Sequence, residues 1–135
     1  MEMPEKDVFD ITIVGAGPAG LFATFYAGLR QMRTKLIDAL DDLGGQVEVL
    51  YPGKAIYDVP GFPKIIGRDL VKNMVEQAKR FDPTIVLGDG VVMVRRTEGG
   101  LLQVETRSGK KHLSRTVLIA AGVGAFSPNR LDVPG

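Results

Sequence analysis

The feature that most constrains the fold of this chain is the segment "ITIVGAGPAG" at residues 11–20. An apolar run stops at Gly15, and further glycines follow at Gly17 and Gly20. This spacing is typical of a strand that turns sharply into a helix. In such a turn the first glycine permits the bend, the second lets the backbone approach a pyrophosphate, and the third lets the helix pack on the strand. The segment therefore predicts a nucleotide-binding site, with a plain structural turn as the alternative.

The helix predicted after the glycine turn is suited to bind an anion. Pro18 fits the first helical turn, where its missing N–H is not required, and Ala19 permits close approach to a sheet. The predicted helix runs to about Met32, contains no acidic residue and has arginines at its end, so its positive N-terminus is left to an anion. Four residues are predicted to line its buried face: Leu21, Phe22, Phe25 and Leu29.

The remaining pattern predicts an α/β fold. Apolar and β-branched runs indicate strands at residues 9–14, 34–38 and 84–87, and an amphipathic helix is predicted from about Asp69 to Arg80. Residues 39–66 are rich in glycine and proline and are predicted to be irregular and functional. Short runs separated by glycine turns then predict an antiparallel meander. The fold class is thus a Rossmann-like parallel sheet with an inserted antiparallel β-meander.

An acid at the end of the second predicted strand narrows the choice of nucleotide. Asp38 follows Gly20 by 18 residues, near the offset of about 20 expected for a ribose-binding acid. Its carboxylate can accept hydrogen bonds from both hydroxyls of an adenosine ribose, and it would repel a ribose 2′-phosphate. NADP is therefore disfavoured at this first site, whereas NAD and FAD both fit.

Composition limits which chemistry the side chains can supply. The 135 residues include 17 basic and 16 acidic side chains, one histidine and no cysteine. Nothing in this balance indicates a nucleic-acid or membrane partner, and the polar start is not a signal peptide, so we expect a soluble cytoplasmic protein. His112 is interpreted as a solvated loop residue. No catalytic residue and no metal site are predicted, so any redox chemistry must come from a bound cofactor.

The motifs in combination resemble the N-terminal FAD-binding segment of the thioredoxin-reductase superfamily, over roughly residues 8–134. They are "VGAGPAGLFATFYAGLRQMRTKLIDAL", "LGGQ", "PGFP", "LVKNMVEQAKRF" and "TVLIAAGVGAF". The stretch "GGQVEVLYPGKAIYDVPGFPK" is most similar to the thioredoxin-reductase-like ferredoxin–NADP reductases of the pyridine nucleotide-disulfide oxidoreductase superfamily. By this resemblance, the inserted meander favours FAD over NAD.

The resemblance implies a two-domain flavoenzyme whose FAD-binding domain is interrupted by an NADPH-binding domain. We expect residues 1–7 to be an N-terminal tail and residues 8–135 to be the N-terminal part of a glutathione-reductase-type FAD-binding domain. The NADPH domain and the C-terminal FAD segment would be absent, and the fragment alone inactive. A thioredoxin reductase stays an alternative, because its cysteine pair would lie in the missing domain. A non-catalytic nucleotide-binding module is another.

The resemblance also implies which residues contact the cofactor. They are Gly15, Gly17, Pro18, Ala19, Gly20, Asp38, Gly45, Gln46, Tyr51, Val91, Ala121, Gly122 and Phe126. Tyr51 is matched to the isoalloxazine ring and Gln46 to the flavin or its ribityl chain, with packing and solvation as the respective alternatives. Tyr57 competes with Tyr51, although packing is its favoured interpretation. Val91 is matched to a backbone contact with adenine, and Phe126 to an apolar wall near the flavin; core packing is the alternative for both.

The implied reaction passes a hydride from NADPH, bound outside this chain, to FAD, and then single electrons to ferredoxin or flavodoxin. The full-length protein is expected to be a homodimer. The basic pairs Arg95–Arg96 and Lys110–Lys111 could belong to a docking surface for an acidic ferredoxin, although exposed charges usually serve solvation.

Overall fold

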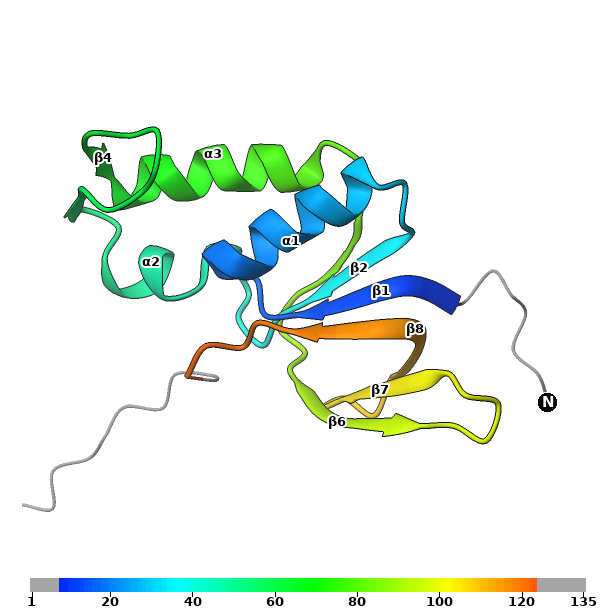
Figure 1. The fold of residues 1–135 in the computed structure, drawn as a ribbon. Helices are drawn as coiled ribbons and strands as arrows, with labels where there is room; N and C mark the ends of the chain where they lie inside the picture. Colours follow the sequence, from blue (N-terminus) through cyan, green and yellow to red (C-terminus); the bar gives the residue numbers. More distant parts are fainter. Residues whose placement is uncertain (1–7, 124–135) are drawn as a thin grey trace, which may run out of the picture.

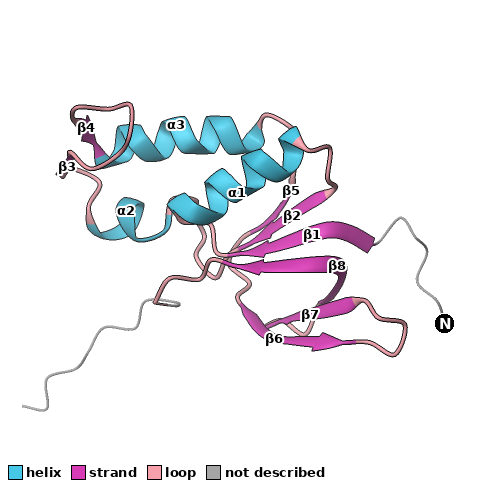
Figure 2. Ribbon diagram, viewed as in Figure 1, coloured by secondary structure: helices cyan, strands magenta, loops and turns pink. Residues whose placement is uncertain are grey.

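The computed structural model describes residues 8–123. In chain order the elements are β1 (Val8–Val14), α1 (Pro18–Leu29), β2 (Thr34–Ile37), α2 (Gly45–Leu50), β3 (Ala55–Ile56), β4 (Ile65–Ile66), α3 (Gly67–Lys79), β5 (Thr84–Val86), β6 (Val91–Arg96), β7 (Leu102–Thr106) and β8 (Lys111–Ile119). Six strands form one sheet in the order β5-β2-β1-β8-β7-β6. Figures 1 and 2 show α1 and α3 together on one side of the parallel strands, with β6 and β7 on the other side.

The sheet has a parallel half and an antiparallel half that share β8. Strand β1 pairs in parallel with β2 and β8, and β2 pairs in parallel with β5. Strand β8 also pairs antiparallel with β7, which pairs antiparallel with β6. Because β8 is nine residues long and is bonded along both edges, it fixes the meander to the parallel strands. The predicted fold class is confirmed.

The core lies between the parallel strands and the two longer helices. Ile13 and Leu36 are register partners in β1 and β2, and both are fully buried. They form one apolar cluster with Leu21 of α1 and Ala78 of α3. Apolar side chains along parallel strands are expected, because helices cover such strands. Helix α3 is amphipathic, as predicted, and buries Leu70 and Ala78.

Helix α1 buries a different face from the predicted one. Leu21 is buried, but the side chains of Phe22 and Leu29 are 52% and 51% exposed. The other buried positions of this helix are small: Gly20, Thr24, Ala27 and Gly28. A Cβ atom on Gly28 would lie 2.6 Å from the Cβ of Phe81, so the backbone of α1 approaches its neighbour closely. The prediction for Phe22 and Leu29 is therefore wrong, because close packing selects small residues and turns the large side chains outward.

Residues 39–66 contain more regular structure than predicted. Helix α2 occupies Gly45–Leu50, and β3 pairs with β4 through Ala55 and Ile66. Gly44 and Gly45 have φ angles of 118° and 59° and form the turn that begins α2. Such angles are readily adopted by glycine. In the sequence, the two adjacent glycines favour a loop, because glycine weakens helices. In the structure, they form the turn from which α2 begins.

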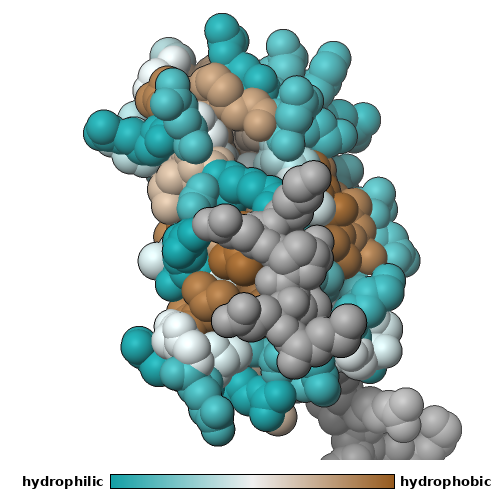
Figure 3. Space-filling view, turned by 90° about the vertical axis from the view of Figure 1, so that its right-hand side faces the viewer, coloured by the Kyte–Doolittle hydropathy of each residue, from teal (hydrophilic) through white to brown (hydrophobic). Residues whose placement is uncertain are grey.

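Several apolar side chains remain exposed on the described surface. Besides Phe22 and Leu29 they include Tyr26 on α1 and Val92 and Met93 on the edge strand β6. Figure 3 shows apolar surface at mid-height of one face, between hydrophilic regions above and below it. Across residues 8–123, no helix has the length and apolar character that crossing a bilayer would require.

Candidate functional site

The glycine turn joins the end of β1 to the start of α1, at the edge where parallel strands end. Gly15 has a φ of 106°, and its N–H donates to the Ile37 carbonyl oxygen at 2.8 Å. A Cβ atom on Gly15 would overlap the Ala120 carbonyl oxygen, and one on Gly20 would overlap the Gly15 carbonyl oxygen. These two glycines are therefore required by the protein's own packing, which brings β1, β8 and α1 together.

Gly17 differs from the other two glycines because the space beside it is open. A Cβ atom there would meet no atom closer than the Cα of Gly45, at 4.0 Å. That space belongs to a cavity of about 360 Å³. The predicted site residues that line this cavity are Gly17, Pro18, Ala19, Gly45, Gln46, Ala121 and Gly122. No side chain caps the N-terminus of α1 and its first turn holds no acid, so its amides are available to an anion in the cavity.

Asp38 lies directly after β2, and its carboxylate is held by two backbone amides. The N–H of Ala16, inside the glycine turn, donates to Oδ2 at 2.5 Å, and the N–H of Leu40 donates to Oδ1 at 2.8 Å. Each carboxylate oxygen has a further lone pair. Asp38 therefore keeps acceptor capacity toward a second, smaller cavity of about 160 Å³, which it lines together with Gly15 and Val91.

The two cavities adjoin. Leu40 and Ala121 line both of them, so they follow each other along the edge at which β1, β2 and β8 end. In open α/β sheets, ligands bind outside the carboxyl ends of the strands. An elongated ligand could thus place an anionic centre at the N-terminus of α1 and a sugar at Asp38.

The aromatic candidates lie beside the larger cavity and do not line it. Tyr51 ends α2 and is 45% exposed, with the Lys54 Nζ atom 5.1 Å from the centre of its ring. Tyr51 and Tyr57 line a third cavity of about 450 Å³, which adjoins the cavity at Gly17 through Val47. Tyr57 is 65% exposed, so the packing favoured for it is wrong. Phe126 lies outside the described residues.

A network around Asp89 lies next to the site, and the motifs in the sequence do not reveal it. The Asp89 carboxylate accepts hydrogen bonds from the Ser108 hydroxyl at 2.6 Å, the Ser108 N–H at 2.9 Å and the Thr106 hydroxyl at 2.8 Å. These bonds, those from Ser108 above all, lower the pKa of Asp89 to about 2. The network ties the β5–β6 connection to the β7–β8 turn. In the sequence, the one signal is an aspartate between Gly88 and Gly90.

Arg107 also lines the smaller cavity, beside Asp38, and sequence reasoning did not select it. Its N–H donates to the Gly90 carbonyl oxygen at 2.8 Å. No motif marks this arginine, because it lies on a hairpin turn that reaches the cavity only after the meander has folded back.

His112 is not a solvated loop residue, contrary to the sequence interpretation. It lies in β8 and is half-buried, with its Nδ1 atom 2.8 Å from the Nζ atom of Lys35 in β2. Burial and the Lys35 charge together lower the pKa of His112 below its ordinary value. His112 lines none of the three cavities described above.

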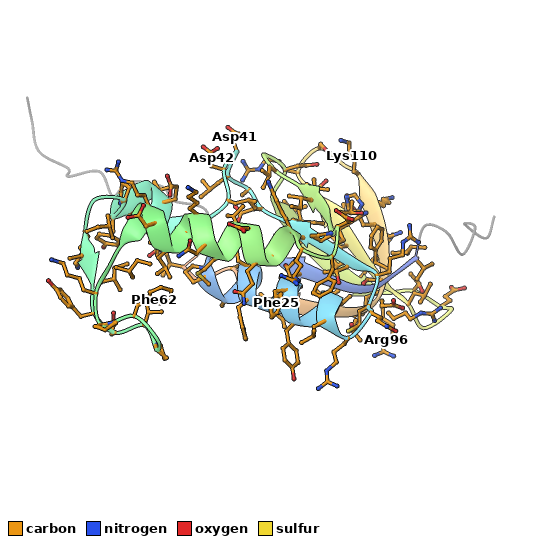
Figure 4. The ribbon with its side chains drawn as sticks, turned by 90° about the horizontal axis from the view of Figure 1, so that it is seen from above. Phe25, Asp41, Asp42, Phe62, Arg96 and Lys110 are labelled. Carbon is orange, nitrogen blue, oxygen red and sulfur yellow. The ribbon has the colours of Figure 1, made fainter. Side chains whose placement is uncertain are left out.

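The basic pairs do not form one surface patch. Seen from above in Figure 4, Arg96 and Lys110 lie at separate edges of the meander. Arg95 is hydrogen-bonded to Gln103 on the neighbouring strand, with Nε at 2.8 Å from Oε1. A docking surface made from both pairs would therefore have to extend across the meander.

Fold and site together are typical of a dinucleotide-binding α/β domain. Residues 9–135 match the family model of the pyridine nucleotide-disulphide oxidoreductases, so the chain belongs to this family. The family resemblance predicted from the motifs is confirmed.

Several of the proteins that this chain resembles are reductases. The chain is 47% identical over 129 residues to ferredoxin–NADP reductase 2 of Oceanobacillus iheyensis, covering 96% of this chain and 39% of the relative. It is 49% identical over 133 residues to ferredoxin–NADP reductase 2 of Listeria monocytogenes serotype 4b (strain F2365), covering 98% and 40%. A solved thioredoxin reductase from Streptococcus pyogenes MGAS5005 superposes with a TM-score of 0.76 at 27% identity, covering 96% and 39%. The chain spans about two fifths of the length of these proteins.

Proposed function

We propose that residues 8–135 form the N-terminal part of the FAD-binding domain of an NADPH-dependent flavin oxidoreductase that reduces ferredoxin or flavodoxin. The observation that carries the proposal is the pair of adjoining cavities, with open space at Gly17 in one and the Asp38 carboxylate in the other. A dinucleotide with a pyrophosphate between two nucleoside halves matches this arrangement.

Each part of the cofactor has a suitable group within reach. The uncapped amides at the N-terminus of α1 would donate to the pyrophosphate, and Gly17 would let it approach the backbone. Asp38 would accept hydrogen bonds from the adenosine ribose. Gln46 lines the larger cavity, and its amide can both donate to and accept from a polar ring edge. Ala121 and Gly122 are small enough for the cofactor to pass over the end of β8.

The choice of FAD rests on charge and on family membership. A 2′-phosphate beside the Asp38 carboxylate would place like charges together, which opposes NADP at this site. Family membership favours a flavin here over NAD. When bound, the flavin supplies hydride and single-electron transfer, and the protein residues position it and exclude water.

The electron acceptor is proposed from the similar proteins. The two relatives named as ferredoxin–NADP reductases share 47% and 49% identity with the chain. A thioredoxin reductase is the second candidate, because the Streptococcus pyogenes enzyme has the same fold over 96% of the chain.

FAD binding is tested with two glycine substitutions in the complete natural chain. Gly17→Val would place a side chain in the open space proposed for the pyrophosphate, and we expect the variant to bind no FAD. Gly53→Val is the matched control, because Gly53 has no atom within 4 Å of an added Cβ and no positive φ. FAD titration should show stoichiometric binding for the wild type and for the control. Stoichiometric flavin in Gly17→Val would contradict the pyrophosphate assignment.

The acceptor is tested by NADPH-dependent reduction of ferredoxin, flavodoxin and thioredoxin, each added separately to the FAD-loaded complete chain. We expect turnover with ferredoxin or flavodoxin. Turnover with thioredoxin alone would favour the second candidate, and FAD binding without turnover would favour a nucleotide-binding module.

A further inference from the structure

Arg107, a basic residue that the dinucleotide motif does not explain, borders the smaller cavity. Arg107 directly follows β7 and lines this cavity together with Asp38, Gly90 and Val91. Its backbone is fixed there, because its N–H donates to the Gly90 carbonyl oxygen at 2.8 Å. Within residues 8–123, the guanidinium itself makes no ion pair and no hydrogen bond, and so is available to a ligand.

The turn that carries Arg107 is held on both sides of this residue. Thr106 and Ser108 both donate to the Asp89 carboxylate, at 2.8 Å from the Thr106 hydroxyl and at 2.6 Å from the Ser108 hydroxyl. The N–H of Asp89 donates in turn to the backbone carbonyl oxygen of Asp38, at 3.2 Å. Asp89 therefore links the turn bearing Arg107, through its carboxylate, to the residue that is proposed to bind ribose, through its backbone N–H.

We propose that Arg107 stacks its guanidinium on the adenine ring of the bound dinucleotide, and that Asp89 is the positioning residue that holds it there. This inference rests on the proposed function, since it takes the adenosine half of FAD as the ligand of the smaller cavity. A guanidinium is planar and weakly hydrated and stacks on aromatic faces. With the ribose at Asp38, the base would extend toward Val91 and Arg107, which line the same cavity.

The two other uses of an arginine here fit the structure less well. The pyrophosphate is proposed at the N-terminus of α1, which lines the larger cavity, and Arg107 lines the smaller one. A ribose 2′-phosphate could pair with Arg107, but the Asp38 carboxylate in the same cavity would repel it. A neutral aromatic base meets no such opposition.

The test uses the complete natural chain without flavin, titrated with FAD, ADP, 2′-phospho-ADP and inorganic pyrophosphate. Arg107→Ala should weaken FAD and ADP by the same factor, roughly 3- to 30-fold, which corresponds to a cation–π contact. Pyrophosphate binding should not change. Arg107→Lys should restore only part of the loss, because lysine lacks the planar group. Arg96→Ala is the control, an exposed arginine of the meander that lines neither cavity.

The outcomes separate this inference from the proposed function. Failure of the wild type to bind FAD would refute both. FAD binding that Arg107→Ala leaves unchanged would overturn the adenine contact alone. Three other results would also overturn the adenine contact: an equal loss of pyrophosphate binding in Arg107→Ala, full binding in Arg107→Lys, or tighter binding of 2′-phospho-ADP than of ADP by the wild type.

The positioning role of Asp89 is tested through Arg107. Asp89→Asn and Ser108→Ala should each weaken ADP binding, and neither should weaken it further when combined with Arg107→Ala. Ser108→Ala removes one hydroxyl from an exposed turn, so it keeps the test valid if Asp89→Asn does not fold. Equal, additive losses in the Arg107→Ala background would show that the network acts independently of Arg107 and would overturn this role.

Discussion

Replacing Asp38 with alanine should lower both the stability of the apoprotein and its affinity for FAD. The carboxylate accepts the Ala16 N–H at 2.5 Å and the Leu40 N–H at 2.8 Å, so it fixes the glycine turn even before a ligand binds. A hydrogen bond to a charged group contributes about 1.5–3 kcal/mol. Because the two bonds are only partly buried, we expect them together to contribute about 1.5–3 kcal/mol to the free energy of unfolding.

The expected loss in FAD binding energy is as large as the expected loss in stability, but it has a separate cause. Removing the carboxylate also removes the acceptor for the ribose hydroxyls, a further ~1.5–3 kcal/mol, or roughly a 10- to 160-fold higher Kd. Stability is measured by urea unfolding of the apoprotein, followed by circular dichroism, and affinity by quenching of FAD fluorescence. Asp38→Asn keeps one acceptor oxygen, so both of its losses should be smaller than those of alanine.

Asp42→Ala is the matched control for this experiment. Asp42 is an exposed aspartate in the connection between β2 and α2, and it lines neither cavity. Figure 4 shows it next to Asp41. Its replacement should leave both quantities within error of the wild type. If Asp38→Ala loses stability but keeps its FAD affinity, Asp38 does not bind the ribose. If Asp38→Ala keeps its stability, Asp38 does not hold the glycine turn in place.

Two further substitutions test the packing. Because the pKa of His112 is lowered in the folded state, its contribution to stability is complete above the ordinary pKa of about 6.5 and is lost as pH falls through the folded value. Urea unfolding at pH 7.5 and 5.5 should show a larger loss for the wild type than for His112→Gln; equal losses would contradict the burial of the imidazole. Gly28→Ala should destabilise by about 1 kcal/mol, since overpacking against Phe81 costs ~1–3 kcal/mol and the helix gains only ~1. A stabilised variant would mean that α1 does not approach Phe81, which follows α3, this closely.

The sequence by itself determined the features that depend only on neighbouring residues along the chain. The glycine spacing at residues 15–20 predicted the turn, since a positive φ and two close backbone contacts leave room for glycine alone. Alternation and glycine turns predicted the antiparallel meander, because strand periodicity is a property of neighbouring residues. The offset of Asp38 placed an acid at the end of β2, next to that turn.

Tertiary structure alone decided which side chains meet across long stretches of chain. The buried face of α1 depends on how closely α3 approaches, so apolar residues such as Phe22 could not be placed from periodicity. His112 lies beside Lys35, 77 residues away, because the β8 strand closes the sheet. Arg107 reaches the smaller cavity because the turn after β7 lies against the connection that contains Asp89, and the spacing of residues in the sequence does not reveal this contact.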